Sequence, residues 1–346
     1  MNAWPELYQY LYHRMIHFGV GYGDLQQITA EPEQWDVFCE RLANFAEQFA
    51  KEAQQALTEK HQITARDYFR RSVDYYHFAQ MRTSDLNQAQ RYREYSRRYF
   101  QQFAALEHSA LKRFEFPFQG TVIPGYVNIV NRRAPCIILF GGLDSAKEVE
   151  LYYFSKLFFQ RGLSVCYFDC PGQGELNGKL PMISYFDSAI QILIDWLLSG
   201  EMIQPAALGA FGVSLGGYLV LRAWSQNPPI KACISLSGFY NYEVFRHLRA
   251  GALPTLNVAL FGKPDHPSIE QLKSVSLNEL AADTRRPILL VHGTRDHLVN
   301  EVQIEKLKMW APHIEININE GAEHVCTSRF SFLLPHLGDW MSKQFE

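Results

Sequence analysis

Apolar residues recur at helical spacing through the first 111 residues. One series with intervals of three or four residues is Phe38, Leu42, Phe45 and Phe49. Because side chains three and four positions apart lie on one face of a helix, this spacing predicts amphipathic helices. The predicted helices span residues 5–18, 32–59, 63–82 and 85–109, and the run Thr83-Ser84-Asp85 offers a cap for the last of them. We therefore expect an N-terminal all-helical domain over residues 1–111.

From residue 112 onward, short apolar runs alternate with amphipathic stretches. Runs such as 137–140 and 288–291 are apolar at every position, which is typical of strands buried on both faces of a parallel sheet. The predicted strands span residues 112–118, 121–130, 135–140, 163–168, 206–211, 231–236, 287–292 and 313–318. The predicted helices span residues 145–162, 184–199, 215–227, 299–310 and 328–344. This alternation predicts an α/β fold over 112–346, with a mostly parallel eight-stranded sheet between helices. The stretch 239–283 is too long for a simple connection, so we expect a helical lid insertion there.

Composition limits the class of protein further. The 33 basic and 36 acidic residues give a net charge of −3, without the basic excess of a nucleic-acid binder. No apolar run is long enough to cross a membrane and the N-terminus lacks a secretory pattern, so we expect a cytoplasmic protein that does not bind membranes. The six cysteines match no zinc spacing and are predicted to be buried reduced thiols. We expect neither a metal nor a cofactor.

One motif carries chemistry. The stretch 207–217 contains Gly212-Val213-Ser214-Leu215-Gly216, which is Gly-x-Ser-x-Gly between a predicted strand and a predicted helix. A serine on such a sharp turn needs small neighbours, and the turn raises its hydroxyl above the sheet. The Leu215 N–H then lies at a helix N-terminus, where it can stabilise a developing oxyanion. The alternative is a packing turn of small residues without chemistry.

A nucleophilic serine needs a base, and the base needs an orienting acid. In hydrolases built on this elbow, the acid and then the histidine follow the serine along the chain. Asp296 follows the strand 287–292 and His324 follows the strand 313–318, so Ser214, Asp296 and His324 have the required order, each just past a strand. His292 and His297 are competing bases, and Glu323 is a weaker candidate for the acid.

A second oxyanion donor is expected in the loop after the third strand. That loop reads Phe140-Gly141-Gly142-Leu143, and we favour the Leu143 N–H, with Gly142 next. A plain turn is the alternative for the two glycines, and the loop lacks the ending of a phosphate-binding P-loop. The stretch 169–175 follows the next strand and is interpreted as a structural turn that borders the site.

These motifs resemble the α/β-hydrolase superfamily over residues 112–346, through the Gly-x-Ser-x-Gly elbow, His-Gly-x-x-Asp at 292–296 and Gly-x-x-His at 321–324. The stretches 64–79 and 141–148 resemble a narrower group with an N-terminal helical domain. That group includes FrsA-like esterases, 2,6-dihydroxypseudooxynicotine hydrolase and hydrolases that shorten polyketide chains, several of which cleave a carbon–carbon bond beside a ketone. Phe140 departs from the histidine that many α/β hydrolases carry there, which leaves the second oxyanion donor less well defined than the triad.

The resemblance makes retro-Claisen cleavage of a β-diketone the leading hypothesis, with Ser214 as nucleophile. Glu243, at the mouth of the insertion, is a candidate for assisting the leaving group, and the alternative is a solvated carboxylate without a role. Tyr240 is a candidate for binding substrate. A carboxylesterase or thioesterase with the same triad is the second hypothesis, and a non-catalytic binding protein is the third. A peptidase like prolyl oligopeptidase is disfavoured, because the residues before 112 read as helices and not as a β-propeller.

The chain is also rich in aromatic residues, at 14%, and they gather in the helical block and in the insertion. Most are expected to pack between helices. Some could form a wall for a flat substrate, which predicts an aromatic or polyketide-like molecule. The helical block itself is expected to act as a cap over the site or as a dimerisation module, so a homodimer is one predicted state.

Overall fold

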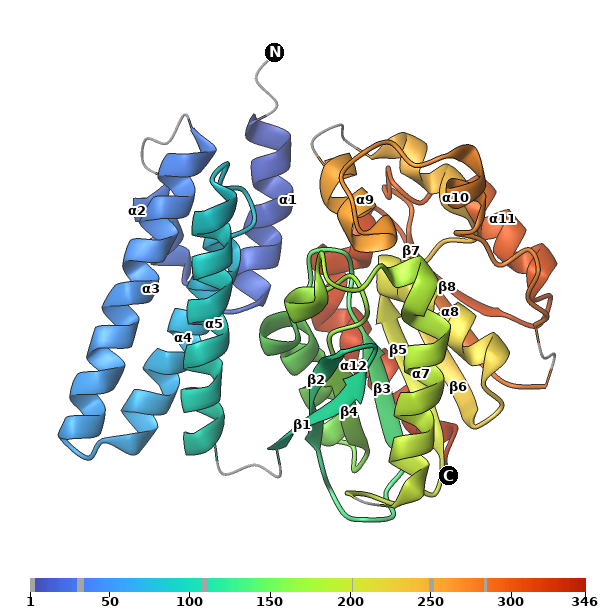
Figure 1. Cartoon of the computed structure of the whole chain (residues 1–346), viewed down its shortest axis with the longest axis horizontal. Coiled ribbons are helices and arrows are strands. Elements are labelled where there is room, and N and C mark those ends of the chain that lie inside the picture. The colour runs from blue at the N-terminus through green and yellow to red at the C-terminus, as the bar shows by residue number, and fades with distance from the viewer. Residues whose placement is uncertain (1–3, 30–33, 108–110, 201, 249–251, 283–284) are drawn as a thin grey trace. The chain divides into compact units, whose positions relative to one another are not determined.

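The computed structural model describes residues 4–29, 34–107, 111–200, 202–248, 252–282 and 285–346, with side chains from residue 11 onward. Two compact units make up the chain. The first combines the residues up to Leu111 with Glu148–Glu150, and the second contains Lys112–Lys147 and Leu151–Glu346. Figure 1 draws the helices of the first unit in blue to cyan and the sheet of the second in green to red. The predicted fold class is confirmed, because an all-helical region precedes an eight-stranded, mostly parallel sheet.

The first unit is a set of packed helices. They are α1 (Trp4–His17), α2 (Tyr22–Ile28), α3 (Trp35–Thr58), α4 (Gln62–Ala79) and α5 (Leu86–Leu106). Helix α4 packs against both α3 and α5 (Figure 1). The Asp85 side chain accepts hydrogen bonds from the N–H groups of Asn87 and Gln88, so the predicted cap of α5 is confirmed. Helix α2 is a correction to the prediction, which placed no helix between the predicted ranges 5–18 and 32–59.

Aromatic rings form much of the interior of this unit. The ring of Tyr76 lies 5.2–6.0 Å from those of Tyr92, Tyr95 and Tyr99, and the ring of Tyr75 is buried beside Phe49. Rings at these separations gain dispersion and quadrupole energy beyond the area that they bury. The tyrosines that the sequence places in the helical block therefore pack against one another at these positions.

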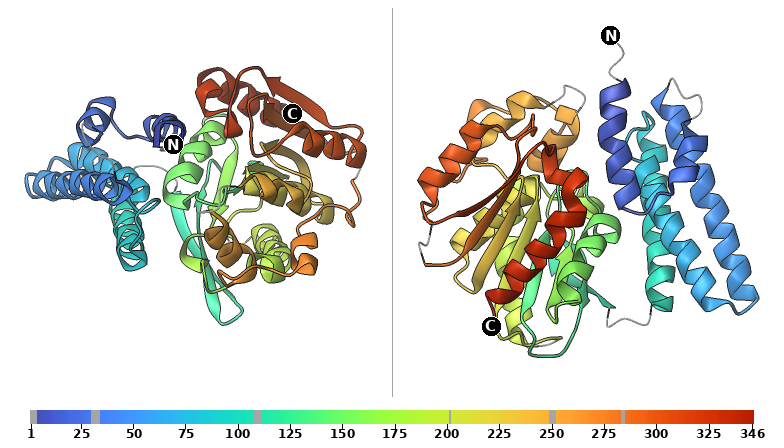
Figure 2. Two further views of the ribbon diagram at one scale, coloured as in Figure 1. Left: turned by 90° about the horizontal axis from the view of Figure 1, so that it is seen from above. Right: turned by 180° about the vertical axis from the view of Figure 1, so that it is seen from behind.

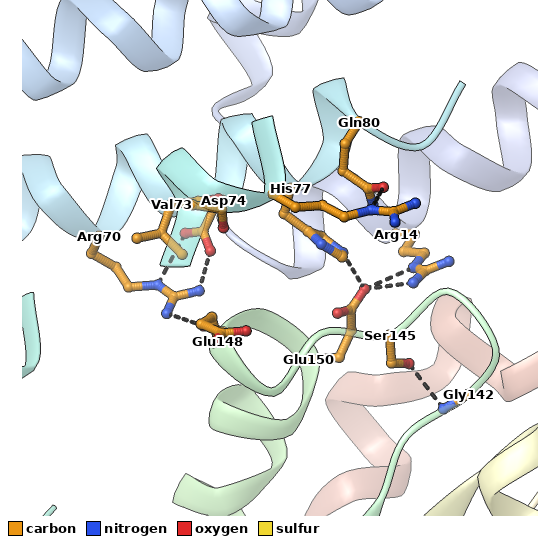
Figure 3. Close-up of polar contacts among 12 residues, drawn as sticks. Arg14, Arg70, Val73, Asp74, His77, Gln80, Gly142, Ser145, Glu148 and Glu150 are labelled. Carbon is orange, nitrogen blue, oxygen red and sulfur yellow. Dashed lines mark hydrogen bonds and ion pairs between the residues drawn. The ribbon is translucent and has the colours of Figure 1, made fainter. Parts of the chain in front are cut away.

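Buried charges hold residues 148–150 within the first unit (Figure 3). The Glu150 carboxylate accepts a hydrogen bond from Arg14 Nε at 3.1 Å and lies 2.9 Å from His77 Nε2. The Arg70 guanidinium donates to the Glu148 carbonyl oxygen at 2.7 Å. Because Glu150 and His77 are almost fully buried, removing either partner would leave a charge or polar group without its compensation.

The second unit is built on one sheet with the strand order β1-β2-β4-β3-β5-β6-β7-β8. The strands are β1 (Leu111–Phe118), β2 (Thr121–Asn128), β3 (Cys136–Phe140), β4 (Ser164–Phe168), β5 (Leu208–Val213), β6 (Ile230–Leu236), β7 (Ile288–Gly293) and β8 (Glu315–Asn319). Strand β2 pairs antiparallel with β4, whereas every pair from β4 to β8 is parallel. All eight strands lie within a few residues of the predicted ranges. Their parallel pairing brings the carboxyl ends of β3, β5 and β7 to one edge.

Helices cover both faces of the sheet. On one face lie α7 (Met182–Ser199) and α8 (Leu215–Gln226), and on the other lie α6 (Tyr152–Phe159) and α12 (Phe330–Lys343), as Figures 1 and 2 show. Helix α11 (Glu301–Trp310) connects β7 to β8. The helix predicted over residues 145–162 begins as a π-helical turn, Lys147–Leu151, before α6. The central strands β3 and β4 are buried at every position, as their continuous apolar runs predict.

The predicted insertion is present between β6 and β7. Its described helices are the 3₁₀ turn Tyr242–His247, α9 (Leu253–Phe261) and α10 (Ile269–Lys273). The Phe239 ring stacks on that of Tyr218 from α8, with centroids 5.0 Å apart, which anchors the start of the insertion. A Cβ on Gly172 would lie 2.1 Å from the carbonyl oxygen of Ala259, so α9 packs directly on the loop after β4.

Candidate active site

Ser214 stands on the sharp turn between β5 and α8. Its φ of 56° and ψ of −116° lie outside the regions that most residues adopt. The neighbouring glycines are sterically required, because a Cβ on Gly212 would lie 2.0 Å from the Gly216 oxygen. A Cβ on Gly216 would in turn lie 2.2 Å from the Phe140 oxygen at the end of β3. The Gly-x-Ser-x-Gly pattern thus places a half-buried serine at the edge where the parallel strands end.

A continuous hydrogen-bonded chain joins the three residues that the sequence singles out. His324 Nε2 lies 2.8 Å from Ser214 Oγ, and His324 Nδ1 lies 2.7 Å from Asp296 Oδ2. Since a carboxylate only accepts hydrogen bonds, Nδ1 carries the proton and Nε2 is free to accept the serine proton. This tautomer is the one that a general base acting on Ser214 needs.

Loop contacts fix the acid and the histidine. Asp296 Oδ1 accepts from the backbone N–H groups of Leu298 and Val299 at 2.9 and 2.8 Å, which leaves Oδ2 for His324. After His324 the chain turns sharply, with a φ of 71° at Val325. The Val325 N–H donates to Ser237 Oγ at 2.9 Å, and this bond ties the histidine loop to the end of β6.

Burial and charge shape the protonation states. Burial acts to raise the pKa of Asp296, but the attraction of His324, its hydrogen bond and the Val299 N–H outweigh burial and lower it. Asp296 is therefore a carboxylate at neutral pH. His292 lies behind it, with Nδ1 4.0 Å from Asp296 Oδ2, and burial lowers the pKa of His292 despite the nearby carboxylate. His292 is thus neutral at pH 7, so it does not place a second cation beside Asp296.

The competing bases and acid occupy other positions. His297 is exposed to solvent. The Glu323 carboxylate accepts from the backbone N–H and the hydroxyl of Ser328, at 2.9 and 2.5 Å, and points away from His324. His292 is 5% exposed and its ring faces Asp296, not Ser214. The geometry therefore favours His324 as base and Asp296 as acid over the alternatives that the sequence leaves open.

Two backbone N–H groups near Ser214 are candidates for stabilising an oxyanion. Leu215 is the first residue of α8, so its N–H has no carbonyl acceptor within the helix. Gly142 approaches the serine closely, because a Cβ built there would lie 3.5 Å from Ser214 Cβ. The N–H of Gly142 itself donates to Ser145 Oγ at 3.0 Å (Figure 3), which favours Leu143 over Gly142 as the second donor.

Glu243 and Tyr240 lie in a different environment. Glu243 forms an ion pair with Lys306 from α11, and the hydrogen bond from Lys306 lowers the pKa of Glu243 although burial opposes it. Both residues line a pocket of about 990 Å³ between the insertion and α11. The lining of this pocket includes none of Ser214, Asp296 and His324. Their roles toward substrate stay predictions.

The structure also shows a residue that the sequence reading missed. Gln173 lies in the loop 169–175, which is interpreted above as a structural turn, and its side chain donates hydrogen bonds to the carbonyl oxygens of Gly141 and Gly142. The signal in the sequence was weak, since a polar residue between two glycines is ordinary in a turn. Only the pairing of β3 with β4 brings the two loops together.

In the part of the chain that the structure describes, no group of three or more histidine, cysteine, aspartate or glutamate side chains is arranged to hold a metal ion. Likewise, no helix among the described residues is both long and apolar enough to cross a membrane. All six cysteines are buried thiols that form no disulfide.

Comparison with known proteins identifies relatives over nearly the whole chain. The 2,6-dihydropseudooxynicotine hydrolase of Paenarthrobacter nicotinovorans is 25% identical over 347 residues, which cover 97% of this chain and 92% of that protein. The crystal structure of a 2,6-dihydroxy-pseudo-oxynicotine hydrolase superposes with a TM-score of 0.85 over 96% of this chain and 95% of that one, at 22% identity, and this shows the shared fold. The α/β hydrolase pydG of an Acremonium species is 28% identical over 61% of this chain, which spans about half (52%) of that protein.

Two family models match as well. The prolyl oligopeptidase family matches residues 186–345, which contain the elbow, the aspartate and the histidine. The FrsA-like esterase family matches residues 37–255, which cover most of the helical unit together with the sheet as far as the insertion. This chain is therefore an α/β-hydrolase enzyme that belongs to the FrsA-like esterase family.

Proposed function

We propose that the protein is a serine hydrolase that cleaves a carbon–carbon bond beside a ketone, with Ser214 as nucleophile, His324 as base and Asp296 as orienting acid. The observation that carries the catalytic part is the hydrogen-bonded chain from Ser214 Oγ through His324 to Asp296. Similarity over 97% of the chain to a hydrolase of 2,6-dihydropseudooxynicotine supports the choice of bond, since the group that the sequence resembles includes enzymes of this kind.

The proposed reaction begins with addition of Ser214 Oγ to the ketone carbon, while His324 Nε2 takes the hydroxyl proton. The carbonyl oxygen becomes an oxyanion, which the N–H groups of Leu215 and Leu143 stabilise. Collapse of the tetrahedral intermediate breaks the bond to the α-carbon. The electron pair leaves as an enolate on the neighbouring carbonyl, and His324 returns its proton to that fragment. Water, deprotonated by His324, then releases the acyl group as a carboxylic acid and restores Ser214.

An esterase is the second candidate, and the FrsA-like family match favours it. Both reactions begin with the same acyl transfer, so the triad geometry does not separate them. The products do: cleavage of a β-diketone gives an acid and a ketone, whereas an ester gives an acid and an alcohol. We propose an aromatic substrate for either reaction.

Paired assays test the proposal. An aryl β-diketone and an aryl ester are incubated separately with the enzyme, and the products are identified by mass spectrometry. We expect an acid and a methyl ketone from the diketone, with a kcat/KM at least tenfold above that of the ester. Turnover of the ester alone would reject carbon–carbon cleavage and leave the esterase. Turnover of either substrate by Ser214→Ala at the wild-type rate would reject the nucleophile.

We further propose that residues 1–111 serve as a cap or a dimerisation module for the enzyme. A dimer predicts a mass of twice the 40.0 kDa chain in light scattering of the full-length protein. A mass of one chain across the micromolar range would reject the dimer and leave the cap.

A further inference from the structure

We propose that Gln173 is a positioning residue that sets the orientation of the Gly142–Leu143 peptide and so presents the Leu143 N–H to the oxyanion. This inference rests on the proposed function, because it concerns the oxyanion-stabilising group of the same site. No motif assigns this role, and the loop that carries Gln173 reads in sequence only as a turn.

The side chain of Gln173 is buried, and both protons of its amide nitrogen are used in hydrogen bonds. The residue is 4% exposed, and its Nε2 donates to the Gly141 oxygen at 3.0 Å and to the Gly142 oxygen at 2.7 Å. An amide nitrogen has two protons, so the two bonds use its whole donor capacity. Its backbone is also held, because the Gln173 N–H donates to the Cys170 oxygen at 2.9 Å.

Because a peptide group is planar, hydrogen bonds that hold its C=O also fix the direction of its N–H, which here belongs to Leu143. In a planar trans peptide, the C=O and the N–H point to opposite sides. The Gly142 oxygen accepts from Gln173 Nε2 and also from the Ser145 N–H at 3.1 Å. With its carbonyl held from one side, the same peptide directs the Leu143 N–H to the other side. Among the described residues, no acceptor takes that N–H.

The loop lies next to the nucleophile, so this direction matters for catalysis. A Cβ on Gly142 would lie 3.3 Å from the Val213 oxygen and 3.5 Å from Ser214 Cβ. Glycine at position 142 therefore allows the backbone to approach the serine. In this proposal, Gln173 decides whether the C=O or the N–H of the Gly142–Leu143 peptide is turned toward the serine. Without the glutamine, rotation of this peptide would exchange the donor for a carbonyl oxygen, which repels an oxyanion.

A second link keeps the loop of Gln173 in place. The Lys147 ammonium lies 2.7 Å from Asp169 Oδ2 and 2.9 Å from Glu175 Oε1, and its side chain is 2% exposed. The Glu175 N–H also donates to Asp169 Oδ2 at 3.0 Å. Loops 141–147 and 169–175 are thus joined at both ends, by Gln173 at one and by Lys147 at the other. These ion pairs fix the position of the loop that carries Gln173, so that its side chain can hold the Gly142–Leu143 peptide in place.

The test compares full-length wild type with Gln173→Met, which keeps the length of the side chain without donors, and Gln173→Glu, which places oxygens against the two carbonyls. Gln191→Met is the matched control, because Gln191 is exposed on α7 and its side chain donates a hydrogen bond to Asp195 on the same helix. Folding is checked by circular dichroism and thermal midpoint. The readouts are kcat and KM for an aryl ester, and the Ki of an aryl trifluoromethyl ketone. That ketone adds to the serine and leaves an oxyanion.

We expect kcat to fall about 10²–10³-fold in both Gln173 variants, as for loss of one oxyanion donor, with KM within twofold. The Ki of the ketone should rise by the same factor as kcat/KM falls, and Gln191→Met should match wild type. A folded Gln173 variant with kcat within threefold of wild type would overturn the proposal. So would a change in KM with an unchanged Ki, or failure of both variants to fold, since either result marks a structural residue only. Ser214→Ala is measured in parallel, and full activity there would overturn the proposed function itself.

Discussion

Replacing Asp296 by asparagine perturbs one atom of the proposed triad, and the structure decides the consequence. In the native protein, one carboxylate oxygen accepts from the Leu298 and Val299 N–H groups, and the other accepts from His324 Nδ1. An asparagine has one oxygen for these two tasks. If that oxygen turned to His324, the amide protons would face the two backbone donors, and leaving the buried Val299 N–H unpaired alone costs about 1–3 kcal/mol. The oxygen should therefore stay on the backbone, and the NH₂ group should face His324.

This orientation reverses the tautomer of the base. His324 Nδ1 becomes an acceptor for the asparagine NH₂, so the proton moves to Nε2, where it blocks acceptance of the Ser214 proton. Loss of the correct tautomer in a serine triad lowers kcat by about 10⁴-fold, which corresponds to about 5.4 kcal/mol at 1.36 kcal/mol for each factor of ten. Substrate binding does not involve this atom, so KM should stay within twofold.

The assay is steady-state hydrolysis of an aryl ester by wild type, Asp296→Asn and a control, Asp195→Asn. Asp195 is exposed on α7 and accepts a hydrogen bond from Gln191, so its amide variant should keep wild-type kcat. Thermal midpoints show whether each variant folds. If folded Asp296→Asn retains more than a tenth of the wild-type kcat, Asp296 is not the orienting acid and the tautomer argument is wrong.

Three further predictions concern packing, thiols and pH. Gly216→Ala should lower the free energy of unfolding by about 1–3 kcal/mol because its Cβ would meet the Phe140 oxygen at 2.2 Å, whereas Gly23→Ala, with nothing within 4 Å, should be neutral in urea unfolding. Burial raises the pKa of the thiols, that of Cys136 to about 12, so a thiol reagent should label none of the six cysteines until denaturant is added, and labelling of the native protein would contradict their burial. Burial also lowers the pKa of His292 in the folded protein below the value of 6.5 for the unfolded chain. Between these two pKa values, the unfolded chain therefore binds more protons at this histidine than the folded protein does. Stability should therefore be unaffected by this group above about pH 6.5 and fall as the pH drops from there through the folded-state pKa. The loss of thermal midpoint between about pH 7.5 and 5.5 should be smaller in His292→Gln, and an equal loss would show that another group is responsible.

Much of the fold follows from local patterns. Continuous apolar runs of four or more residues mark the central strands, because only a strand covered on both faces has no polar side. Helix α2 escaped prediction because it has only seven residues, with glycines before and within its first turn, and it depends on burial of Leu25 and Ile28, which is a tertiary effect. The attachment of residues 148–150 to the helical unit was equally out of reach, because its partners, such as Arg14 and His77, lie more than 70 positions away.

The candidate site divides in the same way. The elbow at Ser214 and the loop positions of Asp296 and His324 could be predicted, since chain order and strand ends constrain them. Gln173 could not, because its function depends on carbonyl oxygens 31 and 32 residues away that only the folded sheet brings near. The choice between Leu143 and Gly142 likewise needed the structure, since a peptide's direction is not encoded in residue type.

The proposed triad makes Ser214 an activated nucleophile. The most direct measurement is the reaction of the full-length protein with a fluorophosphonate, followed by intact mass and peptide mapping. We expect a single phosphonyl adduct on Ser214, complete labelling of wild type, none in Ser214→Ala, and labelling slowed by orders of magnitude in His324→Ala. An unmodified wild-type protein, or an adduct at any other residue, would contradict it.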